Sequence, residues 1–195
     1  MKQAIFLSAS IPDPQRKPEY ADCDPMAFRD AIIALATETA RRHIPLVFGG
    51  HPSITALLAR WAERKGQVNH VELYQSRYFE KEFPPEVRTF PRLHLVDRVA
   101  GDLQANLTHF RQVMLQENPI ALGVFMGGMD GLQEELDLLR QHYPEAVTMP
   151  LMHLGGQTRD IFSLDTLHPL VQEANAAYFS PSGRFAHVLN KIWEK

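Results

Sequence analysis

The sequence has a single cysteine, Cys23, so it can form no internal disulfide and offers no cysteine-based metal site. It also lacks any apolar run close to the roughly 20 residues that a membrane-spanning helix requires. The apolar stretch near the N-terminus, within residues 4–10, is too short for the core of a signal peptide. These absences favour a cytoplasmic protein that has no membrane partner.

No charge of either sign dominates the chain. The formal net charge is −3, and the nine histidines are scattered rather than set in a metal-binding spacing such as HExxH. A nucleic-acid partner is therefore not expected, and neither is a metal or another cofactor. The 195 residues, of which 45% are hydrophobic, are enough for one well-buried domain and short for two. We therefore expect a single domain over residues 1–195.

Short apolar runs alternate with amphipathic helical patterns along the chain. The expected strands cover residues 4–10, 44–50, 68–76, 93–97, 119–128 and 146–156. The first expected helix begins at Asp24 or Pro25. The other expected helices cover 52–65, 102–118, 130–143, 165–177 and 182–194. This order predicts an α/β fold with a Rossmann-like doubly wound parallel sheet between two helical layers, which is a three-layer sandwich.

Small residues follow the expected strands. Gly-Gly pairs follow three of them, and a run of small residues ends a fourth: Gly49-Gly50, Gly127-Gly128, Gly155-Gly156 and Ser8 to Ser10. Ligands of doubly wound sheets bind beyond the carboxyl ends of the strands, so this edge is the expected binding site. A single Gly-Gly pair would be explained more simply by the turn that follows a strand, where glycine adopts a positive φ without strain. The chain has no GxGxxG, GxxxxGK[ST] or GxSxG motif, which argues against standard dinucleotide, P-loop and serine-hydrolase sites.

The segment ALGVFMGGMDGLQEEL (121–136) joins an apolar strand to the start of a helix, and two interpretations compete for it. In the structural one, Asp130 and Gln133 form a capping box, while Glu134 and Glu135 favour the positive end of the helix dipole. In the functional one, exposed N–H groups at this helix start hold an anion, and Glu134 contacts the sugar attached to that anion.

Three basic residues also have paired interpretations. His51 is either a phosphate contact or an exposed turn histidine. Arg77 is either an anion ligand or a solvated loop residue. Arg111 either acts at the site or forms a salt bridge to a neighbouring helix.

FMGGMDGLQEEL resembles the PGGxGTxxE motif of the cytokinin-activating phosphoribohydrolases, long misnamed lysine decarboxylases. The match needs no gap and places Gly127, Gly128 and Glu134 on the two glycines and the glutamate of the motif. Arg111, sixteen residues before Gly127, fits the arginine that the family carries on the preceding helix. LVFGGH resembles the family's first Gly-rich turn, and IFLSAS resembles its opening strand.

The resemblance covers about residues 3–143 and reaches the wider superfamily (SLOG) that joins these hydrolases with DNA-processing protein A. Some branches of it are thought to be nucleotide sensors in bacterial conflict systems. Three motif positions differ here, because Met126 replaces proline, Asp130 replaces glycine, and Gly131 replaces a threonine whose hydroxyl would contact phosphate. These departures weigh against a nucleoside 5′-monophosphate more than against other nucleotides.

The resemblance also implies a homodimer and, in the hydrolase interpretation, a role for two residues. Glu134 would stabilise the oxocarbenium character of the sugar and activate water. Arg111 would orient the substrate or stabilise the departing base.

We therefore predict a nucleotide-binding protein of the sensor type, which recognises a nucleotide or an ADP-ribose-like ligand. The alternative is a nucleotide N-glycoside hydrolase that releases a free base, and an assembly subunit is a third, weaker interpretation. The predicted catalytic residues of the alternative are Arg111 and Glu134. The predicted ligand contacts are Ser8, Ser10, Gly49, Gly50, His51, Gly127, Gly128, Met129, Asp130 and Gly131.

Overall fold

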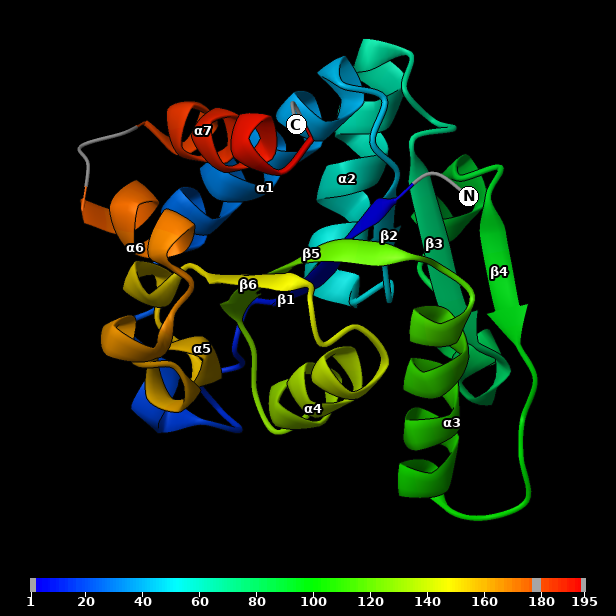
Figure 1. The fold of residues 1–195 in the computed structure, drawn as a ribbon. Coiled ribbons are helices and arrows are strands. Elements are labelled where there is room, and N and C mark those ends of the chain that lie inside the picture. Colours follow the sequence, from blue (N-terminus) through cyan, green and yellow to red (C-terminus); the bar gives the residue numbers. More distant parts are fainter. Residues whose placement is uncertain (1–2, 177–179, 194–195) are drawn as a thin grey trace.

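The computed structural model describes residues 3–176 and 180–193 and contains a six-stranded, all-parallel sheet (Figure 1). The strands are β1 (Ala4–Ser10), β2 (Leu46–Phe48), β3 (Val71–Ser76), β4 (Leu93–Val96), β5 (Ile120–Gly127) and β6 (Val147–Pro150). Their order in the sheet is β4-β3-β2-β1-β5-β6. The chain builds outward from β1 to β4 and then returns to place β5 on the other side of β1. The carboxyl ends of β1 and β5 therefore flank the point where the strand order reverses, which is where such sheets bind ligands.

Helices cover both faces of the sheet, as Figure 1 shows. The α-helices are α1 (Pro25–Arg41), α2 (Pro52–Lys65), α3 (Leu103–Gln116), α4 (Leu132–His142), α5 (Gln157–Ile161), α6 (Pro169–Ala176) and α7 (Pro181–Trp193). Short 3-10 helices are η1 (Pro18–Tyr20), η2 (Arg77–Glu82), η3 (Pro85–Thr89), η4 (Met152–Leu154) and η5 (Leu164–Thr166). Helix α1 packs against α2 and α7 on one face, and α3 packs against α4 on the other. The predicted Rossmann-like, doubly wound, three-layer fold is confirmed.

Local signals in the sequence explain several helix boundaries. The Asp24 carboxylate caps α1 by accepting hydrogen bonds from the N–H groups of Met26 (2.8 Å) and Ala27 (3.2 Å). Pro52 occupies the first position of α2, where its missing N–H costs nothing, and Gly66 ends that helix with a left-handed φ of 63°. Helix α1 begins where expected, and α2 begins and ends where expected.

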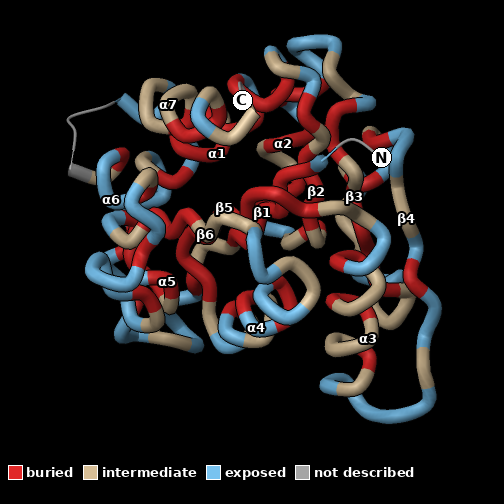
Figure 2. Tube along the Cα trace, in the orientation of Figure 1, coloured by how far each residue is buried: buried red, intermediate tan, exposed pale blue. Residues whose placement is uncertain are grey.

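The core runs along the sheet and under the helices, and the buried segments of Figure 2 trace it. Strand β5 is buried along its whole length, as expected of a parallel strand that is covered on both faces. Its residues pair with every residue of β1 from Ala4 to Ser10. This pairing fixes the two strand ends beside each other. None of the helices within the described residues is long and apolar enough to cross a membrane.

Some predicted boundaries are wrong. The strand predicted at 146–156 ends at Pro150, and the 3-10 helix η4 lies between that strand and Gly155. The strand predicted at 44–50 is reduced to Leu46–Phe48. The two C-terminal helices begin near the predicted positions, but residues 177 and 194, their predicted last residues, lie outside the described part of the chain.

Candidate functional site

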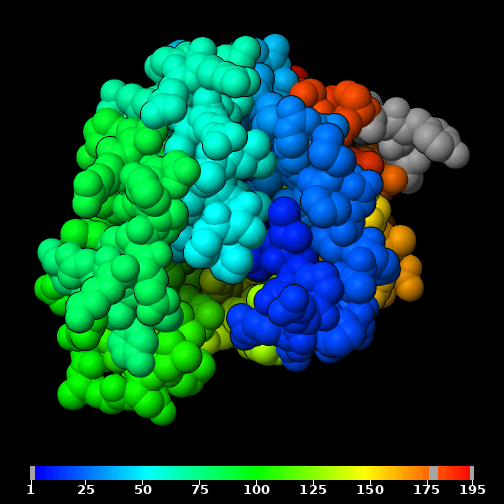
Figure 3. Space-filling model, turned by 180° about the vertical axis from the view of Figure 1, so that it is seen from behind, coloured from blue at the N-terminus to red at the C-terminus, as the bar shows by residue number. Residues whose placement is uncertain are grey.

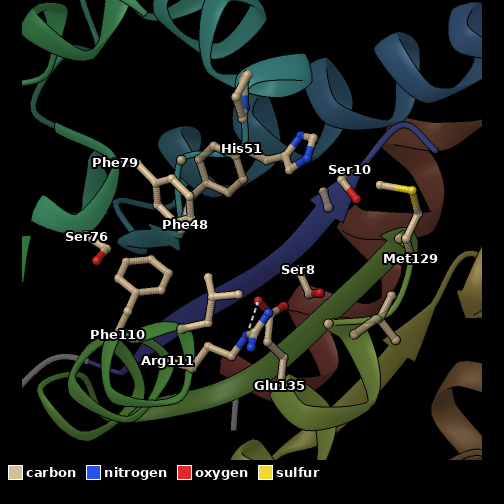
Figure 4. Close-up of a pocket in the computed structure, with 18 of the residues that line it drawn as sticks. Ser8, Ser10, Phe48, His51, Ser76, Phe79, Phe110, Arg111, Met129 and Glu135 are labelled. Atoms are coloured by element: carbon tan, nitrogen blue, oxygen red, sulfur yellow. Dashed lines mark hydrogen bonds and ion pairs between the residues drawn. The ribbon is translucent and has the colours of Figure 1, made fainter. Parts of the chain in front are cut away.

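A cavity of about 680 Å³ opens at the carboxyl ends of β1, β2, β3 and β5. Figure 3 shows it from behind as a hollow between the blue N-terminal segment and the green segment of the chain. Figure 4 shows side chains from all four strand ends facing it. The predicted location of the site, at the carboxyl edge of the sheet, coincides with this cavity.

The turn after β5 forms one end of the cavity. Gly127 and Gly128 have φ values of 62° and 81°, a conformation that residues with a side chain rarely adopt. The N–H of Gly128 donates to the carbonyl of Ser10 (2.9 Å), which ties the end of β5 to the end of β1. The next three N–H groups, those of Met129, Asp130 and Gly131, donate to no described residue. All three residues line the cavity at the start of α4, so this end suits an anion.

Asp130 does not cap α4, so the predicted capping box is wrong. The residue at the cap position is Gly131, and no side chain bonds to the helix start. The Asp130 carboxylate instead turns outward and pairs with the ammonium of Lys17 (2.7 Å), on the loop that follows β1. This pairing neutralises a carboxylate that would otherwise repel an anion bound at the helix start. It also holds the loop, together with the pocket-lining Arg16, beside that position.

His51 lies at the start of α2 and lines the cavity. Its Nδ1 accepts a hydrogen bond from the N–H of Ser53 (3.3 Å) and lies 2.8 Å from the Ser53 hydroxyl. Burial lowers the pKa of His51, and the nearby Arg16 lowers it further. A neutral imidazole whose Nδ1 accepts carries its proton on Nε2, so His51 presents one N–H donor. The structure therefore places His51 in the pocket and not in an exposed turn.

Aromatic side chains form a second wall of the cavity. Phe48, Phe79 and Phe110 face it from the end of β2, from η2 and from α3 (Figure 4). Phe48 and Phe110 are buried, whereas Phe79 is half-buried and packs edge-on against Tyr78. Flat rings around a cavity suit the stacking of a planar heterocycle. These residues were not predicted as site residues, because they look like ordinary core residues in the sequence.

An arginine and two glutamates form the floor. Arg111, a residue that is 8% exposed, donates through Nη1 to Oε2 of Glu134 (2.5 Å), and its Nε lies 3.5 Å from Oε1 of Glu135. Arg111 forms the predicted salt bridge to a neighbouring helix, and it also lines the cavity. Arg111 and Glu134, predicted together from the resemblance, are in direct contact.

Glu135 is a pocket residue that sequence reasoning passed over. Burial raises the pKa of its carboxyl, while Arg111 and a hydrogen bond from Ser8 oppose that rise. The motif match selects Glu134 and not its neighbour. The one available signal was the expected strand end at Ser8, which places a hydroxyl beneath the start of α4.

The replacement of threonine by Gly131 has a structural counterpart. A Cβ at Gly131 would lie 2.3 Å from Nη2 of Arg111. The guanidinium therefore occupies the space that a side chain at this position would need. Glycine at this position therefore removes the hydroxyl that would contact phosphate and also leaves room for the Arg111 guanidinium.

Most predicted ligand contacts line the cavity, but Gly127 does not. Gly127 lies behind the turn, where a Cβ would meet the Ser10 carbonyl at 2.4 Å. Gly155 and Gly156 are also behind it, and Thr158 donates to the Gly127 carbonyl (2.9 Å). Arg77 pairs with Glu80 and Asp97 outside the cavity, as expected of a loop arginine.

No group of three or more potential metal ligands comes together among residues 3–176 and 180–193. The predicted pocket residues that line the cavity are Ser8, Ser10, Gly49, Gly50, His51, Arg111, Gly128, Met129, Asp130, Gly131 and Glu134.

Fold and pocket together define a Rossmann-like α/β protein with its cavity at the topological switch point. Residues 19–179 match the SLOG cluster3 family, and the chain belongs to that family. The X-ray structure of TM1055, a Northeast Structural Genomics Consortium target, is similar in fold. It has a TM-score of 0.51 and 17% sequence identity, with 83% of this chain and 80% of that chain covered. No curated protein matches the sequence.

Proposed function

We propose that this chain is a single-domain, sensor-type protein that binds a nucleotide or an ADP-ribose-like ligand in the cavity at the carboxyl edge of its sheet. Membership of the SLOG cluster3 family points towards nucleotide-related ligands. The observation that carries the proposal is the convergence of three different surfaces on one cavity. These surfaces are free backbone N–H groups, aromatic rings and a carboxylate–arginine floor.

Each surface matches one part of a nucleotide. The N–H groups of Met129 to Gly131, with Arg16 and His51, suit a phosphate. The aromatic wall suits the base, since every base has a face that stacks on an aromatic ring. The floor offers carboxylate oxygens, which accept hydrogen bonds from sugar hydroxyls.

A thermal-shift screen tests the proposal. AMP, ADP, ADP-ribose and the corresponding guanine nucleotides are added at millimolar concentration, with adenosine as the comparison that lacks phosphate. A ligand at 100 times its dissociation constant adds about 2.7 kcal/mol to the free energy of unfolding. We expect a phosphorylated ligand to stabilise the protein and adenosine to stabilise it less. The absence of stabilisation by every nucleotide would contradict the proposal.

A pair of variants locates the ligand. Phe79→Ala removes an aromatic face from the cavity and should weaken binding by roughly 1–3 kcal/mol, the usual contribution of one stacked base. Tyr143→Ala is the control, because Tyr143 is half-buried like Phe79 and does not line the cavity. Equal affinity in the two variants would place the base elsewhere.

Contact between Arg111 and Glu134 inside the cavity supports a second candidate, the nucleotide N-glycoside hydrolase. We favour the sensor, because the donors of three side chains already engage the Glu134 carboxylate and the motif threonine is absent. Chromatography of the incubated ligand separates the two functions. A sensor releases no free base. In a hydrolase, Glu134→Gln lowers release roughly 10²–10⁴-fold, the usual contribution of a positioned acid–base group. Equal release of free base by the wild type and by Glu134→Gln would exclude a catalytic role for Glu134.

A further inference from the structure

The two adjacent glutamates of α4 share Arg111 but otherwise have different partners. Successive residues of an α-helix point about 100° apart, so the side chains of Glu134 and Glu135 leave the helix in different directions. Glu134 faces α3, where its carboxylate accepts from the amide of Gln104 (3.1 Å), the hydroxyl of Thr108 and the guanidinium of Arg111 (2.5 Å). Glu134 therefore links α3 to α4 through these hydrogen bonds.

Glu135 faces β1 at the floor of the cavity. Figure 4 shows its carboxylate beside the Arg111 guanidinium and the Ser8 hydroxyl. Its contact with Arg111 is long, at 3.5 Å, and comes from Nε alone. A carboxylate can accept about four hydrogen bonds, so Glu135 keeps acceptor capacity that the described residues do not fill. Glu135 nevertheless has the less exposed side chain of the two, 19% against 26% for Glu134.

The charge around this floor selects the kind of group that Glu135 can accept from. One guanidinium serves two carboxylates, so this end of the cavity is acidic when both are ionised. A phosphate would be repelled here, whereas a hydroxyl can donate to the partly buried carboxylate. A pair of neighbouring hydroxyls, as in a ribose, can donate to both of its oxygens.

We infer that Glu135 is the residue that reads the sugar of the ligand, and that it makes the site selective for ribonucleotides over deoxyribonucleotides. The inference rests on the proposed nucleotide-binding function and departs from the resemblance, which assigns the sugar to Glu134. A partly buried acceptor that loses its donor is costly, which turns one missing hydroxyl into a measurable loss of affinity. Specificity then comes from the penalty on the ligand that lacks the group.

Calorimetric titration of the wild type with ADP, 2′-deoxy-ADP, AMP, 2′-deoxy-AMP and 3′-deoxy-AMP tests this inference. The ribonucleotide should bind roughly 10- to 100-fold more tightly than its deoxy analogue, the affinity ratio expected when a hydrogen bond to a charged group is lost. Equal binding of the two sugars would overturn the inference and leave the nucleotide proposal intact. Failure of every nucleotide to bind would overturn both.

Variants assign the selectivity to its residue. Glu135→Gln should reduce the ratio to a few-fold, and Asp137→Asn, an exposed carboxylate-to-amide change on the same helix outside the cavity, should preserve it. If Glu134→Gln removes the selectivity and Glu135→Gln does not, the inference is wrong. It is also wrong if Glu135→Gln changes the preference between adenine and hypoxanthine nucleotides but not between sugars.

Glu135→Asp covers the case in which the amide variant does not fold. It keeps the charge at the same position and shortens its reach by one methylene. A folded Glu135→Asp protein should bind the ribonucleotide less tightly and the deoxy analogue unchanged. An unchanged ratio would refute the inference.

Discussion

Replacing Gly131 with alanine tests whether Arg111 is held in place by the two glutamates. The backbone at Gly131 has a φ of −87°, which alanine adopts without strain, so the substitution acts through its side chain. The new Cβ would lie 2.3 Å from Nη2 of Arg111, well inside van der Waals contact. The guanidinium must therefore move away from the carboxylates that it bridges.

Two opposing contributions set the magnitude. Loss of a hydrogen bond to a charged group costs roughly 1.5–3 kcal/mol. A change from glycine to alanine at a compatible position regains about 0.4–1 kcal/mol through the unfolded chain. Gly131→Ala should therefore destabilise the fold by about 0.5–2.5 kcal/mol. Chemical denaturation of the variant and the wild type measures the difference.

A double-mutant cycle identifies the cause. In an Arg111→Met background no guanidinium has to move, so the added cost of Gly131→Ala should largely disappear. A neutral or stabilising effect of Gly131→Ala in the wild type would refute the reasoning, since Arg111 would then be free to move. The same cost in both backgrounds would also refute it, because the cause would lie in the backbone.

Two further predictions concern stability and assembly. Burial lowers the pKa of His70 to about 4, so the folded protein holds this residue neutral, while the unfolded chain binds its proton near the ordinary value. The free energy of unfolding should therefore decrease by up to roughly 3 kcal/mol as the pH falls from about 6.5 to about 4. His70→Gln should flatten this part of the plot of stability against pH. An unchanged plot would contradict the assignment to His70. The protein should be a homodimer, as the resemblance implies, and a monomeric mass by light scattering at tens of micromolar would contradict that prediction.

Much of the architecture is predictable from the sequence because each signal is local. The alternation of apolar runs and amphipathic patterns determines the class of fold. Asp24 marks a helix start through its side chain, and Pro52 and Gly66 mark helix ends through their backbone. The prediction fails where the cause is distant. Asp130 looks like a cap within its own segment, and the ammonium of Lys17, far away in the sequence, draws its carboxylate elsewhere.

The site was predictable in position but not in all its parts. Glycines and serines at strand ends mark the edge where ligands bind, and most of them line the cavity. Phe79 and Glu135 escaped detection because their role depends on which way a side chain points after the helices have packed. Most Leu, Phe and Met residues of 102–118 and 130–143 lie in the core. Phe110, Met114 and Leu139 are buried there, and Leu103 is exposed.

The contact between the second and third glycine pairs makes the end of the cavity at the start of α4 depend on the C-terminal part of the chain. A Cβ at Gly156 would lie 2.5 Å from the carbonyl carbon of Gly127, and the N–H of Gln157 donates to the carbonyl of Gly128 (3.0 Å). The turn is therefore ordered by the fold itself, so a ligand meets donors whose conformational entropy was lost during folding and not at binding. It follows that the backbone N–H of Gln157, a residue outside the cavity, exchanges its hydrogen with solvent only when that turn opens.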